Sequence, residues 1–186
     1  ATKRTYLLFN QGTQLKPIDI VSLAEKVDEP ITICGFTFLI YASLLKPLLE
    51  KRSQFRLPPG SKIIHIGGWK KLEEQKVDRH QLLASINKVF DINTEAVVDI
   101  YGFTEQMGTL YPECIEGKKH CPIFADLIVR DPLTLKEIED GEIGIGQFLS
   151  TVPHSYPGFS LLTDDMIRVV GRDTCSCGRK GTRFET

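Results

Sequence analysis

The chain has no long apolar run and almost no net charge. Its longest apolar stretch, Phe36 to Leu49, is interrupted by Ser43, Lys46 and Pro47 and falls short of a membrane-spanning helix, which needs roughly 20 residues. No basic segment followed by an apolar leader opens the chain. The 23 basic and 24 acidic side chains give a formal net charge of −1, so nothing draws the chain generally to nucleic acid or anionic lipid. We therefore expect no membrane span and no nucleic-acid partner.

Two common nucleotide-binding fingerprints are also absent. The sequence contains neither the G-x-x-x-x-G-K-[ST] phosphate loop nor the G-x-G-x-x-G turn of dinucleotide-binding domains. An α/β nucleotide binder of either class is therefore disfavoured.

Cysteine is scarce, and its placement excludes a secreted disulfide framework. There are five cysteines, an odd number. Cys34 stands alone in an apolar run, which predicts a buried thiol. The others form two groups, Cys114 with Cys121 and Cys175 with Cys177. Such grouping is typical of metal binding in a reducing compartment, so we expect a cytoplasmic protein.

What is present predicts an α/β fold. Strand-like runs over Pro30–Gly35, Ser61–Ile66 and Ala96–Ile100 alternate with helical patterns over Phe36–Lys51 and Asp78–Phe90. This alternation predicts a parallel, Rossmann-like sheet with flanking helices.

The pattern changes after residue 122. Asp-Pro, Asp-Gly and Pro-Gly turns separate four short strand-like runs. These runs are Phe124–Arg130, Glu142–Ser150, Phe159–Thr163 and Met166–Val170. We therefore expect an α/β nucleotide-binding subdomain over residues 1–122, followed by a smaller β-rich subdomain over 123–186 that completes the site.

Two predicted strands end in residues suited to a nucleotide. One runs into G-G-W at 67–69 and the other into Y-G-F-T-E at 101–105. In open parallel sheets, ligands bind outside the carboxyl ends of the strands. Glycine admits a flat ligand, tyrosine offers a ring face, threonine can donate to phosphate, and glutamate can bind Mg²⁺. The alternative is structural: Gly67 and Gly68 form a turn, Tyr101 belongs to the core, and Glu105 opens a helix.

These residues resemble the motifs of a known superfamily. Tyr101 to Glu105 is similar to the Y-G-x-T-E motif of the adenylate-forming enzymes, which include acyl-CoA synthetases and peptide-synthetase adenylation domains. The stretch 160-SLLTDDMIRVVG-171 resembles their later T-x-D segment, with Thr163 and Asp165 in the matching places. The H-I-G-G-W-K stretch, 129-VRDPLT-134 and 175-CSCGRKG-181 look most like acyl-protein synthetases, the long-chain-fatty-acid–luciferin-component ligases of bacterial light emission. Phenylacetate-CoA ligases are near relatives. The resemblance covers roughly residues 30–186.

Position by position, the resemblance implies the parts of an ATP/AMP site. Thr104 would bond the α-phosphate and Glu105 would hold Mg²⁺, so these two are the implied catalytic residues. Asp165 would accept hydrogen bonds from the ribose hydroxyls. Asp164 is the alternative at that position, because adjacent side chains of a strand point to opposite faces. Four residues would line the adenine pocket, with the tyrosine stacking on the ring: Gly67, Gly68, Tyr101 and Gly102.

The implied activity is that of an ATP-dependent acyl ligase. A carboxylic acid, expected to be a fatty acid, would attack the α-phosphate of ATP to give acyl-adenylate and pyrophosphate. The acyl group would then pass to a protein thiol or hydroxyl, or to coenzyme A. The alternative is a non-catalytic, zinc-stabilised binding module with the same fold.

Two parts of the family pattern are missing from this sequence. Residues 10–13 are too short and ill-composed for the Ser/Thr/Gly-rich phosphate loop, and no small carboxyl-terminal lid domain with its lysine follows. The chain also begins at Ala1 without methionine and stops at Thr186, just after a glycine-rich turn. We expect a fragment of the large amino-terminal domain, inactive by itself.

The cysteine groups suggest a zinc site. Structural zinc takes four thiolate or imidazole ligands in a tetrahedron. The C-x₅-H and C-x-C spacings are only suggestive by themselves, but related phenylacetate-CoA-ligase-like proteins use such sets. The expected ligands are Cys114, His120, Cys175 and Cys177, with Cys121 spare because it precedes Pro122. The alternative is a set of free, partly buried thiols with His120 on the surface.

Overall fold

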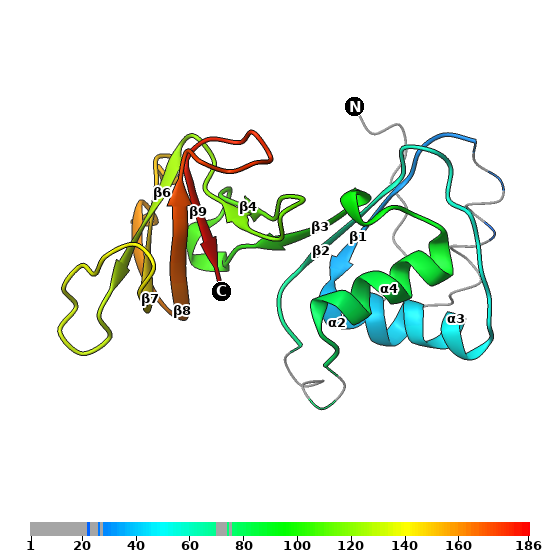
Figure 1. Cartoon of the computed structure of the whole chain (residues 1–186). Coiled ribbons are helices and arrows are strands. Elements are labelled where there is room, and N and C mark those ends of the chain that lie inside the picture. Colours follow the sequence, from blue (N-terminus) through cyan, green and yellow to red (C-terminus); the bar gives the residue numbers. More distant parts are fainter. Residues whose placement is uncertain (1–21, 23–25, 27, 70–73, 75) are drawn as a thin grey trace. The chain divides into compact units, whose positions relative to one another are not determined.

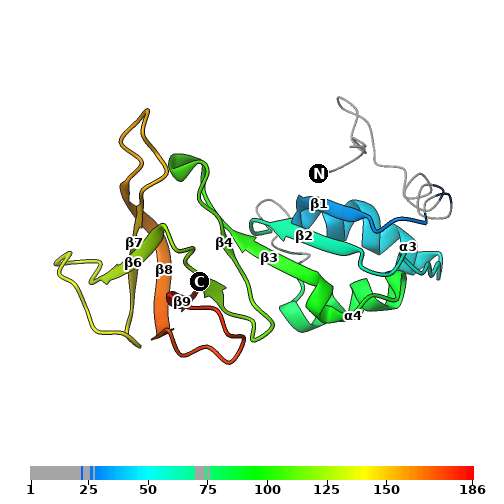
Figure 2. The same ribbon diagram turned by 90° about the horizontal axis from the view of Figure 1, so that it is seen from above.

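The computed structural model describes residues 22, 26, 28–69, 74 and 76–186 of the 186-residue chain. The chain divides into two compact units, Ala1–Val98 and Asp99–Thr186 (Figures 1 and 2). The sequence pattern predicts a later division, between residues 122 and 123. Residues 10–13 lie outside the described part. Among the described residues, no helix combines the length and apolar character needed to cross a bilayer.

The first unit contains the predicted parallel strands. Strands β1 (Thr32–Phe36) and β2 (Lys62–Ile66) pair in parallel, with Ile33 opposite Ile63. The strand order of this sheet is β1-β2-β3-β4, and β3 (Val97–Tyr101) runs across the boundary between the units. The predicted α/β class with a parallel sheet is confirmed.

The helices also form where periodicity predicts them. The first is a continuous helical stretch composed of α2 (Thr37–Leu39), the π-helical η1 (Ile40–Leu45) and α3 (Lys46–Glu50). The π-helical segment lies just before Pro47, whose ring cannot make the regular helical hydrogen bond. Helix α4 spans Arg79–Phe90.

Side-chain capping defines the start of α4. The Asp78 carboxylate accepts from the backbone N–H of Gln81 at 2.8 Å, and the Gln81 side chain accepts in return from the Asp78 N–H. This reciprocal capping box satisfies two N–H groups that the helix itself leaves free. The helix ends at Phe90, and the C-cap residue Asp91 adopts a left-handed conformation with φ of 48°.

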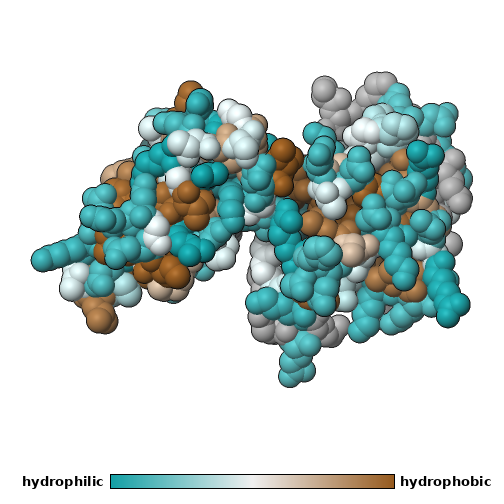
Figure 3. Space-filling model, in the orientation of Figure 1, coloured by the Kyte–Doolittle hydropathy of each residue, from teal (hydrophilic) through white to brown (hydrophobic). Residues whose placement is uncertain are grey.

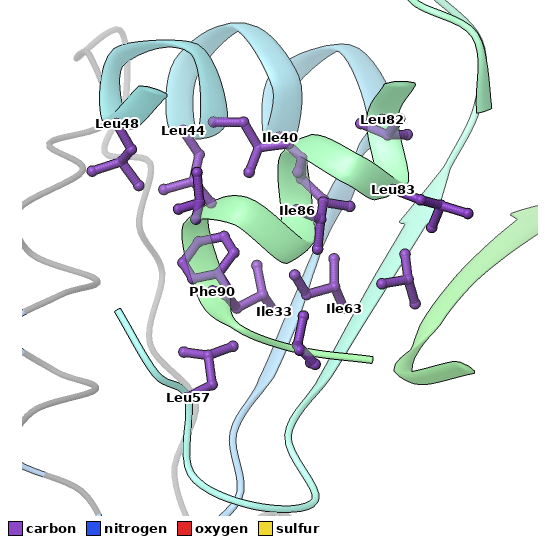
Figure 4. Packing of buried hydrophobic residues seen from close by; sticks show 14 residues of the cluster. Ile33, Ile40, Leu44, Leu48, Leu57, Ile63, Leu82, Leu83, Ile86 and Phe90 are labelled. Atoms are coloured by element: carbon purple, nitrogen blue, oxygen red, sulfur yellow. The ribbon is translucent and has the colours of Figure 1, made fainter. Parts of the chain in front are cut away.

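The helices and strands of the first unit share one apolar core (Figure 4). Burying each such side chain contributes about 1.5–3 kcal/mol. Residues from the helical stretch, α4 and both strands meet in this core. The labelled members are Ile33, Ile40, Leu44, Leu48, Leu57, Ile63, Leu82, Leu83, Ile86 and Phe90.

Only one face of β1 is buried. Ile33 lies in the core, whereas Cys34 is exposed. The expectation of a buried Cys34 thiol was therefore wrong. Successive side chains of a strand point to opposite faces, so an apolar run alone does not show that both faces are covered.

The second unit is β-rich, as predicted. Its main sheet has the strand order β5-β9-β8-β7-β6, and all four neighbouring pairs are antiparallel. The five strands are β5 (Lys119–His120), β6 (Ala125–Arg130), β7 (Ile143–Ser150), β8 (Ser160–Arg172) and β9 (Thr182–Glu185). The two strands predicted after Pro157 are one long strand, β8. A short strand, β4 (Tyr111–Pro112), pairs with the end of β3.

An aromatic cluster forms the core of the second unit. Phe148 and Phe184 are fully buried, with ring centroids 5.7 Å apart, and Tyr111 lies 5.0 Å from Phe148. Tyr101 packs against the same cluster, 5.4 Å from Phe148. Such tilted and edge-on ring pairs stabilise a core beyond the area they bury.

Figure 3 shows hydrophilic residues over most of the visible face of the second unit.

Candidate functional site

The two predicted nucleotide motifs meet at Tyr101 and Asp165. Tyr101 is the last residue of β3, and Asp165 lies in the middle of β8. The Tyr101 hydroxyl donates to Oδ2 of Asp165 at 2.5 Å, although the residues are 64 positions apart. Burial, and then the hydrogen bond to Asp165, raise the pKa of Tyr101 far above its usual value. The phenol is therefore protonated and acts as a donor at all ordinary pH values.

Of the two adjacent acids on β8, Asp165 is the one that faces Tyr101. The structure shows the bond from the Tyr101 hydroxyl to Asp165 and, within the described residues, none to Asp164. Both acids are exposed. An exposed carboxylate beside the tyrosine ring can accept hydrogen bonds from a diol.

Thr104 and Glu105 occupy a short 3-10 helix, η4 (Thr104–Gln106), directly after the tyrosine motif. Both side chains are exposed, and the Thr104 hydroxyl donates to Oε2 of Glu105 at 3.2 Å. Hydroxyl and carboxylate oxygens side by side are chemically suited to a phosphate and its Mg²⁺. The implied catalytic pair is thus accessible and adjacent.

A residue that the sequence analysis missed fixes this short helix. Gln106 is 1% exposed, and its Nε2 donates to the carbonyl oxygens of Phe148 at 3.3 Å and Gly158 at 3.1 Å. The Tyr111 hydroxyl donates to Gln106 Oε1 at 2.6 Å. Because these partners hold Gln106 inside, its neighbours Thr104 and Glu105 are held at the surface. A single glutamine in so short an element carries no periodic signal that would have revealed this role.

Gly67 and Gly68 follow β2 in the first unit. Gly67 has a φ of +80°, a conformation that favours glycine, and a side chain at Gly68 would meet no atom within 4 Å. The backbone is therefore open to close approach at this strand end. Their membership of one adenine pocket with Tyr101 and Gly102 stays a prediction.

Two other residues near this strand end have structural roles. His65 is 7% exposed, and its Nδ1 lies 2.9 Å from the Thr37 hydroxyl. Trp69 is also 7% exposed and packs edge-on against Tyr41, with ring centroids 5.1 Å apart. These contacts are those of core residues.

The four predicted metal ligands come together in the second unit. The ligand atoms of Cys114, His120, Cys175 and Cys177 all lie within 4.8 Å of one another. The Sγ atoms of Cys114 and Cys175 are 3.9 Å apart, and Sγ of Cys177 is 3.7 Å from Nε2 of His120. A tetrahedron with Zn–S bonds of about 2.3 Å has edges of about 3.8 Å. The set therefore fits a zinc ion.

Two turns position these ligands. The turn between β4 and β5 is closed by hydrogen bonds from the Cys114 N–H to the Lys118 carbonyl and from the Gly117 N–H to the Cys114 carbonyl, each 2.9 Å long. His120 then ends β5. The connection from β8 to β9 carries Cys175 and Cys177. One ion would thus join segments that are distant in sequence.

The protonation states of the neighbouring groups favour this ligand set. Burial, and then the charges of Arg179 and Arg183, lower the pKa of His120, so its imidazole is neutral as a metal ligand must be. Burial, and then Asp126, raise the pKa of Cys121 to about 12. Cys121 packs in the aromatic core, so it is a neutral core thiol and not a fifth ligand.

Comparison with known sequences decides the family. The family model described as "Acyl-protein synthetase, LuxE" matches residues 16–186. The chain belongs to the LuxE acyl-protein synthetase family.

Curated relatives agree with the LuxE assignment. Over 139 residues the chain is 31% identical to the long-chain-fatty-acid–luciferin-component ligase of Aliivibrio fischeri, covering 73% of this chain and 35% of the relative. Over 105 residues it is 32% identical to the ligase of that name from Vibrio harveyi, covering 56% of this chain and 27% of the relative. The chain thus spans about a third of the length of these LuxE relatives.

Solved structures share the fold of this LuxE family chain. A 2-hydroxyisobutyryl-CoA ligase in complex with 2-HIB-AMP and CoA matches with a TM-score of 0.65 and 18% identity, covering 90% of this chain and 35% of that one. ATP-bound MatB from Rhodopseudomonas palustris matches with a TM-score of 0.55 and 15% identity, covering 90% and 32%. At these identities the likeness establishes the fold alone.

Proposed function

We propose that this chain supplies the nucleotide-binding core of an ATP-dependent acyl ligase. The protein would activate a fatty acid as acyl-adenylate and pass the acyl group to a protein thiol or hydroxyl, or to coenzyme A. The observation that carries this proposal is the hydrogen bond between Tyr101 and Asp165, because it joins two motifs that must meet at one AMP. Family membership supports the same activity.

Each residue has a distinct task in this proposal. Asp165 accepts hydrogen bonds from the ribose diol, and the ring of Tyr101 lies against the adenine. Thr104 donates to the α-phosphate, and Glu105 is the ligand for Mg²⁺. Gly102, the neighbour of Tyr101, would let the adenine approach the backbone closely.

The chemistry requires positioning more than covalent participation by the protein. A carboxylate oxygen of the acid forms a bond to the α-phosphorus of ATP as the bond to pyrophosphate breaks. Mg²⁺, when bound, supplies positive charge to the phosphate oxygens. Thr104 and Glu105 orient the reacting phosphate, and such positioning can supply about 7–11 kcal/mol of the barrier reduction.

We further propose that Cys114, His120, Cys175 and Cys177 bind a structural zinc ion. Four protein ligands close the coordination sphere, which leaves no open position for catalysis. The ion would fasten the β4–β5 turn to the β8–β9 connection. The described cysteines form no disulfide, which fits a reducing compartment, and we propose the cytoplasm.

Calorimetry on the full-length protein tests the nucleotide site. We expect binding of AMP and of ATP·Mg²⁺, and ATP–pyrophosphate exchange that depends on added fatty acid. Failure to bind either nucleotide, with Glu105 and Asp165 intact, would refute the ligase proposal. Nucleotide binding without exchange for any acid would favour a binding module that keeps the fold.

Metal analysis tests the zinc centre separately. We expect about one equivalent of zinc in protein purified without chelator. Less than about a tenth of an equivalent, with no uptake from added zinc, would refute the zinc centre and leave the nucleotide proposal untouched.

A further inference from the structure

Arg183 occupies a central position beside the four candidate zinc ligands. It lies on β9, the strand between β5 and β8. In the sheet register, Arg183 is opposite His120 on one side and opposite Gly171 on the other. Directly opposed residues of antiparallel strands have Cβ atoms about 4.5–5.5 Å apart, so Arg183 is flanked by a ligand and by the strand that leads to Cys175.

The Arg183 guanidinium fills the space above Gly171. A Cβ atom at Gly171 would lie 2.8 Å from Nε and 3.0 Å from Nη2 of Arg183, and the φ of Gly171 is +151°. Alanine at this position would therefore displace the guanidinium as well as strain the backbone. A β-bulge falls at the same place, between Val169 and Gly171. The local backbone thus accommodates one particular placement of the arginine head group.

Within the described structure, Nε of Arg183 is buried and has no hydrogen-bond partner. A buried, unsatisfied N–H of a charged group is costly, and an anion nearby offsets that cost. Cys175 can supply this anion as a thiolate, because its sulfur hydrogen-bonds with Arg183. Thr174, the residue before Cys175, lies beside the same space, since a Cβ atom at Gly171 would be 3.1 Å from its hydroxyl oxygen.

A zinc centre at this site would carry a negative net charge, and this charge explains the presence of an arginine beside it. Three thiolates and one neutral imidazole around Zn²⁺ carry a net charge of −1. Cys114 and His120 are buried, at 7% and 3% exposure, so this charge is poorly solvated. A guanidinium cannot be deprotonated in a protein, and it donates through several N–H groups in a fixed plane.

We propose that Arg183 is the counterion of the zinc centre and donates its N–H groups to the Cys175 sulfur, with Gly171 leaving the space for it. This inference rests on the zinc centre proposed above and deepens it. Arg183 is a positioning residue and not a ligand, because it donates to the Cys175 sulfur and orients it without binding the ion itself.

The test compares zinc affinities of matched arginine variants. Zinc dissociation constants are measured for the chain by competition with a chromophoric chelator. We expect Arg183→Gln to weaken zinc binding about 10–100-fold, the usual cost of losing an outer-sphere partner. Arg168→Gln is the matched control, because Arg168 carries the same charge on β8 but is exposed and bonded to Glu185. We expect the control to change zinc affinity by less than about twofold.

A second readout reports on the thiolates themselves. In cobalt-substituted protein, the sulfur-to-cobalt charge-transfer band should shift in Arg183→Gln and in Arg183→Lys but not in Arg168→Gln. If Arg183→Gln does not fold, Arg183→Lys decides the matter. A shifted band with affinity weakened about threefold or more supports the proposal, because lysine keeps the charge but loses the planar donor set.

Unchanged affinity and an unchanged cobalt band in every folded Arg183 variant would overturn the counterion role. Equal losses in Arg183→Gln and Arg168→Gln would overturn it as well, since net charge alone would then account for the effect. A wild-type chain that binds no zinc would instead refute the metal centre itself. The two failures are therefore distinguishable.

Discussion

The phenol of Tyr101 and the carboxylate of Asp165 are joined across the second unit by a 2.5 Å hydrogen bond. Tyr101 belongs to the motif that ends β3, and Asp165 belongs to the motif on β8. In the nucleotide proposal, the ring of one and the carboxylate of the other face the base and the ribose of the same AMP.

Replacing Asp165 tests the ribose contact. We expect Asp165→Asn to weaken AMP binding about 10–100-fold in calorimetry, because charge-assisted hydrogen bonds contribute about 1.5–3 kcal/mol. Asp164→Asn is the control, since Asp164 is an exposed neighbour on the same strand, and its effect should stay under about threefold. Equal losses in the two variants, or a loss in the control alone, would contradict the assignment of Asp165.

Replacing Glu105 tests the metal contact. In Glu105→Ala, ATP binding should no longer respond to Mg²⁺, while AMP affinity stays within about threefold of wild type, because AMP binding does not need the metal. Titrations with and without Mg²⁺ measure both quantities. Glu116→Ala, an exposed glutamate in the β4–β5 turn, serves as the control and should keep the Mg²⁺ response. Persistence of that response in Glu105→Ala would place the Mg²⁺ ligand elsewhere.

Cys121, which is not among the four candidate ligands, provides an internal control for the zinc centre. Cys114→Ser should lower zinc content from about one equivalent to under about a tenth. The unfolding free energy should fall by about 4 kcal/mol when free zinc exceeds the dissociation constant a thousandfold. Cys121→Ala should keep the zinc and lose only about 1–2 kcal/mol from the core. Metal analysis and urea unfolding report the two effects, and loss of zinc from Cys121→Ala would show that the ligand set is misassigned.

Features with a strong local cause were predictable from the sequence. A short apolar run predicted β2, and apolar residues at helical spacing predicted α4. The side chain of Asp78 caps the start of that helix. The strands β5 and β9 were missed because they have two and four residues, too few for a period to show. Their pairing places His120 opposite Arg183, a relationship that no local pattern contains.

Parts of the candidate site followed from residue chemistry together with the family resemblance. The cysteine and histidine spacings are only suggestive by themselves, but the resemblance to proteins that use such sets allowed the four candidate zinc ligands to be chosen before their proximity was known. Gln106 could not be foreseen, because its role depends on carbonyl groups more than 40 residues away. Arg183 was missed for the same reason. Its position beside the candidate ligands depends on the register in which β9 pairs with β5 and with β8.

Gln106 offers a test of how η4 is held. Gln106→Ala would leave the carbonyls of Phe148 and Gly158 and the Tyr111 hydroxyl without their partner. We expect the unfolding free energy to fall by about 2–4 kcal/mol and Mg²⁺-dependent ATP binding to weaken with it. Gln54→Ala, at an exposed position, should change stability by less than about 0.5 kcal/mol. Similar stabilities in the two variants would show that Gln106 is not an anchor.

The pH dependence of stability should reveal the ion pairs of Glu185. Its carboxylate accepts from Lys118 and from Arg168, and these two hydrogen bonds, in that order, lower its pKa. A lowered folded-state pKa contributes stability that is fully present above the unfolded value of about 4.3 and is lost as pH falls through the folded value. We expect Glu185→Gln to cost about 1 kcal/mol or less at pH 7, because the side chain is 29% exposed.

Urea unfolding of wild type and Glu185→Gln from about pH 2.5 to about pH 7, a range that brackets the glutamate pKa, measures this difference. Zinc lost in acid affects both proteins, so the difference between them isolates the carboxylate. The gap should be constant above about pH 5 and should close only below about pH 4.3. Glu116→Gln, an exposed glutamate, should show no such step. A gap that widens as the pH falls would have the opposite sign, and it would mean that Glu185 is more easily protonated in the folded chain than in the unfolded one.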